Sequence, residues 1–140
     1  MKKIYFACSV RGGRADADIY AQILKIISKY ATPLTEVLTD KRLTPRGSPG
    51  DVAEIYKKDL GWLKESSALI AEATNPSLGV GYEIAQAEQM GKPVLVLYRP
   101  QPDRRLSALI AGSPGSQVLV YDKVAELEPT IKAFIAELSN

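Results

Sequence analysis

The sequence contains no histidine and a single cysteine, Cys8. Histidine is the usual general acid or base at neutral pH, so proton transfer would have to use carboxylate, tyrosine, lysine or cysteine side chains. Zinc sites normally take histidine and cysteine ligands, so this composition argues against one; we expect neither a metal nor another cofactor. One cysteine cannot form a disulfide within the chain and fits a reducing compartment such as the cytoplasm.

Long apolar runs and a strong excess of one charge are also missing. No run approaches the roughly 20 apolar residues of a membrane-spanning helix. The 18 lysines and arginines nearly balance the 16 aspartates and glutamates, which leaves a net charge of +2. This balance gives no reason to expect a nucleic-acid polymer or a membrane as a partner, although a local basic patch could still bind a small anion. We therefore expect a soluble, cytoplasmic protein.

What the sequence does contain is a regular alternation of strand and helix patterns. Short apolar runs predict strands at residues 3–8, 34–38, 68–73, 93–98 and 117–121. Apolar residues near helical spacing predict helices at residues 16–30, 51–66, 82–90, 104–111 and 124–138, and a loop rich in proline and glycine lies at 39–50. Apolar strands with helical crossovers imply a parallel sheet covered on both faces. We predict one α/β domain over residues 1–140, with a doubly wound, flavodoxin-like five-stranded sheet of order 2-1-3-4-5.

In such a sheet, ligands bind outside the carboxyl ends of the strands, near the switch point between the first and third strands. Two loops are expected to meet there. The first is Ser9-Val10-Arg11-Gly12-Gly13-Arg14, whose glycines, hydroxyl and guanidinium groups suit a nucleotide. It matches neither the GxGxxG pattern nor a P-loop, so a tight turn with exposed arginines is the alternative.

The second loop follows the third strand and contains Ser77 and Gly79. Glycines let a ligand approach the backbone, and the start of the next helix offers unpaired N–H groups to a phosphate. We expect Glu83 in the first turn of that helix, an unusual place for a negative charge beside a bound anion. A carboxylate there suggests attack on a phosphorylated ligand or its sugar, although it would also simply favour the helix dipole. Asp16, Asp18 and Asp51 are typical of capping or surface positions, and we assign them no role.

These loops, with several further segments, resemble the nucleoside 2-deoxyribosyltransferase superfamily and, within it, the 2'-deoxynucleoside 5'-phosphate N-hydrolases. The resemblance runs from about Ile4 to Ile110 and is most specific in Ser77-Leu78-Gly79-Val80-Gly81-Tyr82-Glu83. Its other segments, in the same order, are residues 4–6, 9–14, 59–63, 71–76, 91–95, 99–100 and 106–108. The chain departs from the family at Cys8, where we expect a glycine. No histidine or lysine neighbours this thiol in sequence to lower its pKa, so we do not expect it to be a nucleophile.

The resemblance implies hydrolysis of the N-glycosidic bond of a (2'-deoxy)nucleoside 5'-monophosphate to free base and (2-deoxy)ribose 5-phosphate. It implies that Glu83 is the nucleophile, that Asp59 assists the leaving base and later activates water, and that Tyr5 orients Glu83. A retaining reaction of this kind needs its two carboxylates about 5 Å apart. From the residues alone, Tyr5 is also compatible with core packing and Asp59 with a solvated helix position.

The resemblance also implies how the phosphate is bound. Ser77 and Gly79 would hold it, residues 9–14 would add contacts, and Ser107 would reach it from the neighbouring subunit of a homodimer with a shared active site. Serines are common in loops, so each alone is weak evidence. Two other functions stay open: a deoxyribosyltransferase that passes the sugar to another base, and a nucleotide-binding module without turnover.

Overall fold

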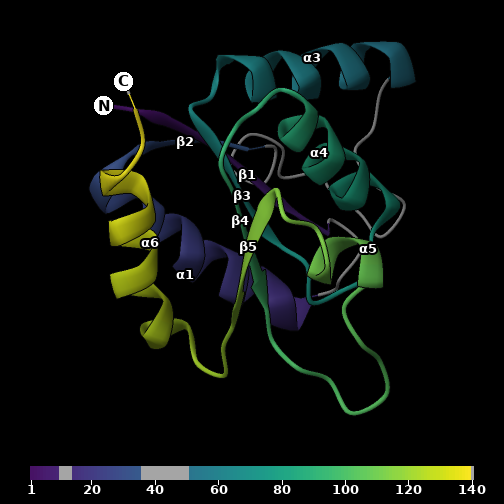
Figure 1. Cartoon of the computed structure of the whole chain (residues 1–140), viewed down its shortest axis with the longest axis vertical. Helices are drawn as coiled ribbons and strands as arrows, with labels where there is room; N and C mark the ends of the chain where they lie inside the picture. Colours follow the sequence, from purple (N-terminus) through teal and green to yellow (C-terminus); the bar gives the residue numbers. More distant parts are fainter. Residues whose placement is uncertain (10–13, 36–50, 140) are drawn as a thin grey trace.

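Five parallel strands form one sheet in the order β2-β1-β3-β4-β5 (Figure 1). The structure is a computed structural model that describes residues 1–9, 14–35 and 51–139. The strands are β1 (Lys3–Cys8), β2 (Thr32–Leu34), β3 (Ala68–Glu72), β4 (Val94–Tyr98) and β5 (Ser116–Val120). The predicted fold class and strand order are confirmed.

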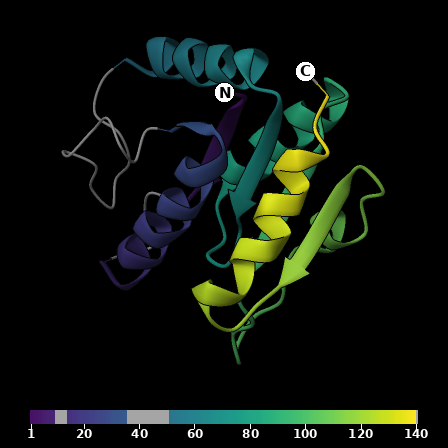
Figure 2. The same cartoon turned by 90° about the vertical axis from the view of Figure 1, so that its left-hand side faces the viewer.

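Helices cover both faces of this sheet (Figures 1 and 2). They are α1 (Arg14–Tyr30), α3 (Val52–Glu65), α4 (Leu78–Gln89), the short α5 (Ala108–Ala111), the 3-10 helix η1 (Val124–Leu127) and α6 (Glu128–Ala136). One face packs against α1 and α6, and the opposite face packs against α3 and α4. No helix in the described parts of the chain is long and apolar enough to cross a membrane.

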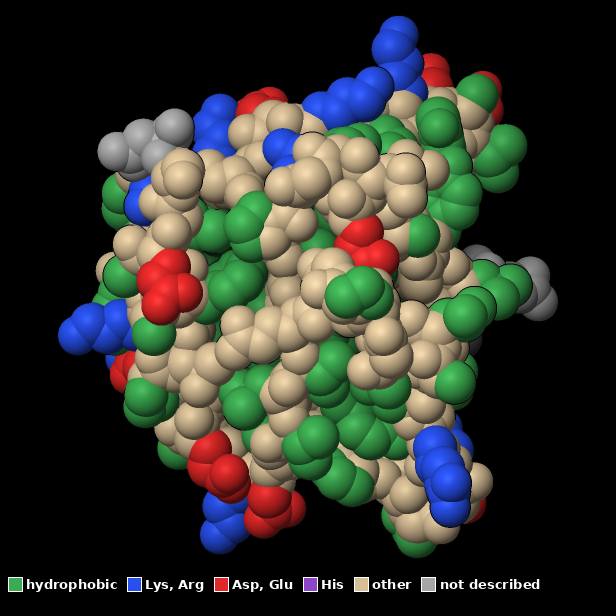
Figure 3. Space-filling view, in the orientation of Figure 1, with side chains coloured by type: hydrophobic (Ala, Val, Ile, Leu, Met, Phe, Trp, Pro, Cys, Tyr) green, Lys and Arg blue, Asp and Glu red, His purple; other side chains and the backbone are tan. Residues whose placement is uncertain are grey.

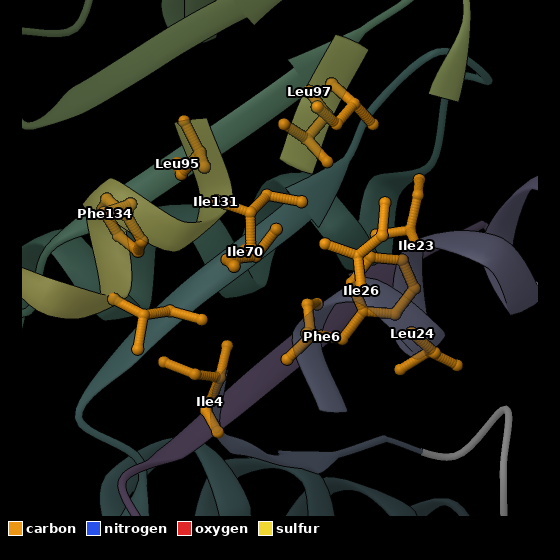
Figure 4. Packing of buried hydrophobic residues seen from close by; sticks show 14 of the residues in the cluster. Ile4, Phe6, Ile23, Leu24, Ile26, Ile70, Leu95, Leu97, Ile131 and Phe134 are labelled. Atoms are coloured by element: carbon orange, nitrogen blue, oxygen red, sulfur yellow. The ribbon is translucent and has the colours of Figure 1, made fainter. Parts of the chain in front are cut away.

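Alternation along the strands divides the core into two halves. In β1, Ile4 and Phe6 join the cluster under α1 and α6, whereas Tyr5 and Ala7 join the cluster under α3 and α4. Figure 4 shows the first cluster, where Ile70 of β3 lies close to residues of α6. Neighbouring residues of one strand therefore serve opposite faces.

Several element boundaries differ from the prediction. The second strand is Thr32–Leu34, not 34–38, because it pairs with β1 immediately after α1, starting at Lys3 opposite Thr32; residues 36–38 and the predicted loop at 39–50 lie outside the described residues. The last helix is split into η1 and α6, with a proline in the first turn of α6, where its missing N–H costs nothing. The predicted helix at 104–111 shortens to Ala108–Ala111.

Two valines in neighbouring strands test how much the buried core stabilises the fold. Val96 in β4 has no exposed surface, whereas Val120 in the edge strand β5 is 59% exposed. We expect Val96→Ala to lower the free energy of unfolding by about 2 kcal/mol, because it removes buried methyl groups and leaves a cavity. The matched change Val120→Ala should cost about 0.5 kcal/mol or less. Urea unfolding would measure both, and equal losses would contradict this division between core and edge.

Candidate active site

A hydrogen bond joins β1 to α4 at the centre of the candidate site. The Tyr5 side chain points to the α3/α4 face, is only 3% exposed, and donates its hydroxyl hydrogen to Oε2 of Glu83. Glu83 itself is half-buried. The bond holds the carboxylate in one orientation above the sheet, because a buried phenol must keep its partner.

The start of α4 differs from the prediction and changes where Glu83 lies. The helix begins at Leu78 rather than residue 82, because Ser77 caps it: the Ser77 hydroxyl accepts a hydrogen bond from the Val80 N–H at 3.2 Å. Glu83 is therefore in the second turn, and its expected place in the first turn is wrong. The rise from Leu78 to Glu83 is about 7.5 Å. An anion at the helix start and the carboxylate of Glu83 would thus be separated rather than superposed.

Neither the backbone conformation nor packing within the chain requires the glycines beside the cap. Gly79 and Gly81 are helical, and among the described residues Gly91, just after α4, is the glycine with a positive φ, 72°. A Cβ built on Gly81 would meet no atom within 4 Å, and one on Gly79 would meet only the Ser77 Oγ at 3.8 Å. The surface over both residues is open. The N–H groups of Leu78 and Gly79, which have no helical carbonyl to bond, are thus open to a ligand.

The third predicted catalytic residue, Asp59, lies in α3. This helix packs against both β1 and α4, the elements that carry Tyr5 and Glu83. Asp59 is half-buried, its Oδ1 is shielded from solvent, and it stands one turn before the buried Leu63. The three residues therefore come from three elements in mutual contact.

A pocket of about 430 Å³ opens beside the start of α4. Its walls are the loop after β3, the start of α4 and the segment around α5, namely Ala73, Thr74, Asn75, Pro76, Ser77, Leu78, Val80, Gly81, Arg105, Leu106, Ser107 and Ile110. Within one chain, Ser107 and Ser77 share this pocket, and Glu83 is not among its lining residues.

A buried carboxylate ties together the ends of three strands. Glu72, the last residue of β3, has no exposed surface. It accepts hydrogen bonds from the backbone N–H and the hydroxyl of Thr74, both at 2.8 Å, and from the hydroxyl of Tyr121. Burial, and then the hydrogen bond to Glu72, raise the pKa of Tyr121, so its hydroxyl stays protonated as a donor. The Thr74 hydroxyl also accepts from the backbone N–H of Arg99 at 3.0 Å, which links the β3 and β4 loops.

The network continues to the first turn of α1. The Arg99 guanidinium lies 2.7 Å from Oδ1 of Asp16 and donates to the Tyr121 hydroxyl at 3.3 Å. Oδ2 of Asp16 accepts from the side-chain amide of Asn75, whose own Oδ1 accepts from Arg104 at 3.0 Å. Asp16 is thus a buried, paired residue, and its interpretation as a capping or surface carboxylate is wrong. Asp51, by contrast, does cap α3, accepting from the Ala53 N–H at 2.8 Å.

This network is the part of the site that the sequence argument missed. Glu72 offered one signal, because it is a charged residue inside the apolar run predicted as a strand at residues 68–73. Asp16, Asn75 and Arg99 lie far apart in the chain, and nothing local pairs them. Their roles depend on the packing of α1 beside the strand ends.

The first predicted ligand loop is described at its two ends. Ser9 is buried directly after β1, and Arg14 is the first residue of α1. The substrate contacts predicted for Val10, Arg11, Gly12 and Gly13 lie outside the described residues. Within residues 1–9, 14–35 and 51–139, no cluster of cysteine, aspartate and glutamate side chains could hold a metal ion.

Cys8 should react slowly with alkylating reagents in the folded protein. Burial raises its pKa, and the negative charges of Glu72 and Glu83 raise it further, so the reactive thiolate is scarce. We expect iodoacetamide to modify Cys8 far more slowly in the native protein than in urea. Mass spectrometry would follow the modification in both conditions at the same pH. Equal rates in the two conditions would show that the thiol is accessible and ionised as in an unfolded chain.

Known proteins with similar sequences are nucleotide hydrolases by name. A protein of Mus musculus named 5-hydroxymethyl-dUMP N-hydrolase is 44% identical over 126 residues, which cover 88% of this chain and 73% of the mouse protein. A protein of Esox lucius with the same name is 42% identical over 143 residues, covering 98% of each chain.

Solved structures and a family model agree with the fold. A CMP N-glycosidase of Clostridium botulinum superposes with a TM-score of 0.66 at 18% identity, over 94% of this chain and 99% of that one. At this identity the likeness concerns the fold alone. The model of the family described as nucleoside 2-deoxyribosyltransferase matches residues 4–118. With this match and relatives above 40% identity, the chain belongs to the nucleoside 2-deoxyribosyltransferase family.

Proposed function

We propose that this chain hydrolyses the N-glycosidic bond of 2'-deoxynucleoside 5'-monophosphates, releasing the base and 2-deoxyribose 5-phosphate. The observation that carries the proposal is the carboxylate of Glu83, held by the Tyr5 hydroxyl in the second turn of α4, whose capped start can receive a phosphate. The names of the relatives, which are N-hydrolases of a deoxynucleoside monophosphate, support the same substrate class.

In the proposed first step, Glu83 displaces the base. A carboxylate oxygen forms a bond to C1' of the sugar on the face opposite the base, while the N-glycosidic bond breaks and its electron pair passes to the base nitrogen. Asp59 donates a proton to the departing base. Tyr5 is a positioning residue here, because its hydrogen bond to Oε2 fixes the plane of the attacking carboxylate.

In the proposed second step, water releases the sugar. Asp59, now a carboxylate, takes a proton from water, the water oxygen bonds to C1', and the ester bond to Glu83 breaks with its electrons returning to the carboxylate. The product is 2-deoxyribose 5-phosphate. If a second nucleobase attacked C1' in place of water, the same intermediate would pass its sugar to that base, which is the reaction of a transferase.

The proposed phosphate site is the start of α4. The N–H groups of Leu78 and Gly79 and the positive end of the helix dipole attract an anion. The Ser77 hydroxyl accepts a hydrogen bond from Val80, so its own hydrogen remains a donor for a phosphate oxygen. The separation of about 7.5 Å between the helix start and Glu83 leaves room for the sugar between them.

Base release from monophosphates tests this function directly. Incubation with the four deoxynucleoside monophosphates, their ribo counterparts and 5-hydroxymethyl-dUMP, followed by chromatography, should show free base. Glu83→Ala should lower kcat at least about a thousandfold, because it removes the nucleophile, and Asp59→Asn by about a hundredfold or more. Glu65→Ala, which changes an exposed carboxylate paired with Lys3, serves as the matched control and should keep full activity.

Two other results would replace the proposal. Base exchange between unphosphorylated deoxynucleosides, with no release from any monophosphate, would indicate a transferase. Tight binding of a monophosphate without any turnover would indicate a binding module.

We also propose that the site is completed by a second copy of the chain. Within one chain, Ser107 already lines the pocket that contains Ser77, so the proposal of a shared site rests on the exposed apolar surface around α4 and α5. Exposed apolar side chains surround this region, with Leu78 97% and Leu109 88% exposed. Val52, Tyr56 and Tyr82 extend the patch onto α3 and α4, and Figure 3 shows hydrophobic side chains gathered along that edge of the molecule. Exposed apolar side chains gathered in this way are typical of protein interfaces.

Mixing two inactive variants tests whether the site is shared. In a symmetric dimer with a shared site, a heterodimer of Glu83→Ala and Ser107→Ala contains one intact site and one doubly damaged site. Random exchange of subunits should then restore about a quarter of wild-type activity. Each variant mixed with itself is the control. Activity equal to the mean of the two separate variants, or sedimentation as a monomer at assay concentration, would contradict the shared site.

A further inference from the structure

Asn75 lies in the segment that leads into α4, and its side-chain hydrogen bonds to Asp16 and Arg104 fix which way its amide points. Arg104 can only donate, so it must face the oxygen of the Asn75 amide, and the carboxylate of Asp16 can only accept, so it must face the Asn75 nitrogen. The amide therefore has one orientation. Asp16 is the residue that holds its donor side.

Asp16 is itself held in place. Its Oδ1 pairs with the Arg99 guanidinium at 2.7 Å, and the two side chains are only 13% and 19% exposed. Arg99 in turn donates to Tyr121, which donates to the buried Glu72. Charged hydrogen bonds shielded from water are stronger and more directional than exposed ones. The position of Asn75 is thus set by α1 and by the ends of β3 and β4.

A single proline, Pro76, connects Asn75 to the residue that caps α4. Pro76 lies between Asn75 and Ser77, and its ring restricts the backbone φ to about −65°. Ser77 is the cap of α4, and Ser77 and Leu78 both line the pocket. A displacement of Asn75 would therefore move the cap rather than be absorbed in a flexible loop.

We propose that Asp16 is a positioning residue for the phosphate-binding start of α4, acting through Asn75. This inference rests on the proposed function, because it makes the contact a determinant of affinity for the 5'-phosphate. Asp16 does not touch the reacting atoms. Its loss should therefore raise KM for a monophosphate while leaving the chemistry on Glu83 largely intact.

An exchange of the two side chains tests the contact itself. Asp16→Asn places two amide groups together and Asn75→Asp places two carboxylates together, so each single change removes the matched pair of donor and acceptor. In the double variant Asp16→Asn/Asn75→Asp, every bond again has a donor and an acceptor: Arg99 to Asn, that Asn to Asp, and Arg104 to the same Asp. We expect each single variant to raise KM for the best monophosphate substrate at least about tenfold with kcat within about threefold. The double variant should recover a KM close to wild type.

Hydrogen exchange gives a second readout that needs no turnover. In the ligand-free protein, the N–H of Val80 and those of neighbouring residues at the start of α4 should lose protection in each single variant and regain it in the double variant. Unchanged KM and protection in the single variants, even with a lower melting temperature, would overturn the proposal by showing a structural role alone. Failure of the double variant to recover either quantity would also overturn it. Absence of base release by the wild-type protein would refute the proposed function, and the exchange pattern would still decide the role of Asp16.

Discussion

A carboxylate with no access to water must find all its hydrogen bonds within the protein, and in this chain that constraint falls on Glu72. Its partners are Thr74, in the loop after β3, and Tyr121, just after β5. Thr74 also receives a hydrogen bond from the backbone of Arg99 after β4. The loops at the carboxyl ends of three strands are thereby held at one point, and the start of α4 is built on that point.

The alternation of side chains along the strands separates two tasks. On the α3/α4 face lie Tyr5 and Glu83, the hydrogen-bonded pair to which the proposed function assigns the chemistry. On the α1/α6 side lies the charged network around Glu72 and Asp16, which suits positioning rather than chemistry. Cys8 lies close enough to Glu72 and Glu83 for both charges to raise its pKa. The two tasks therefore meet at the switch point, where ligands of such sheets bind.

The parts of the site carried by local pattern were the predictable parts. The strand, loop and helix around Ser77 and Glu83 could be recognised as a unit because strand apolarity, small loop residues and helical spacing are all local properties. The exact start of α4 could not, because Gly79 and Gly81 favour a loop by propensity, whereas the Ser77 cap extends the helix back to Leu78. Because the first turn was missed, Glu83 was expected next to an anion at the helix start, whereas it lies about 7.5 Å along the helix from that start.

The sequence by itself determined the alternating α/β order, the parallel sheet and the segments that carry the family resemblance, because hydrophobic periodicity and short motifs survive without knowledge of the fold. Only the tertiary structure decided that Asp16 is buried against Arg99 and Asn75, and that Ser107 lines the same pocket as Ser77. Asp16 and Arg99 are 83 positions apart in the chain. Hydrogen bonds and ion pairs depend on distance in space, and that distance is fixed only when the helices pack onto the sheet.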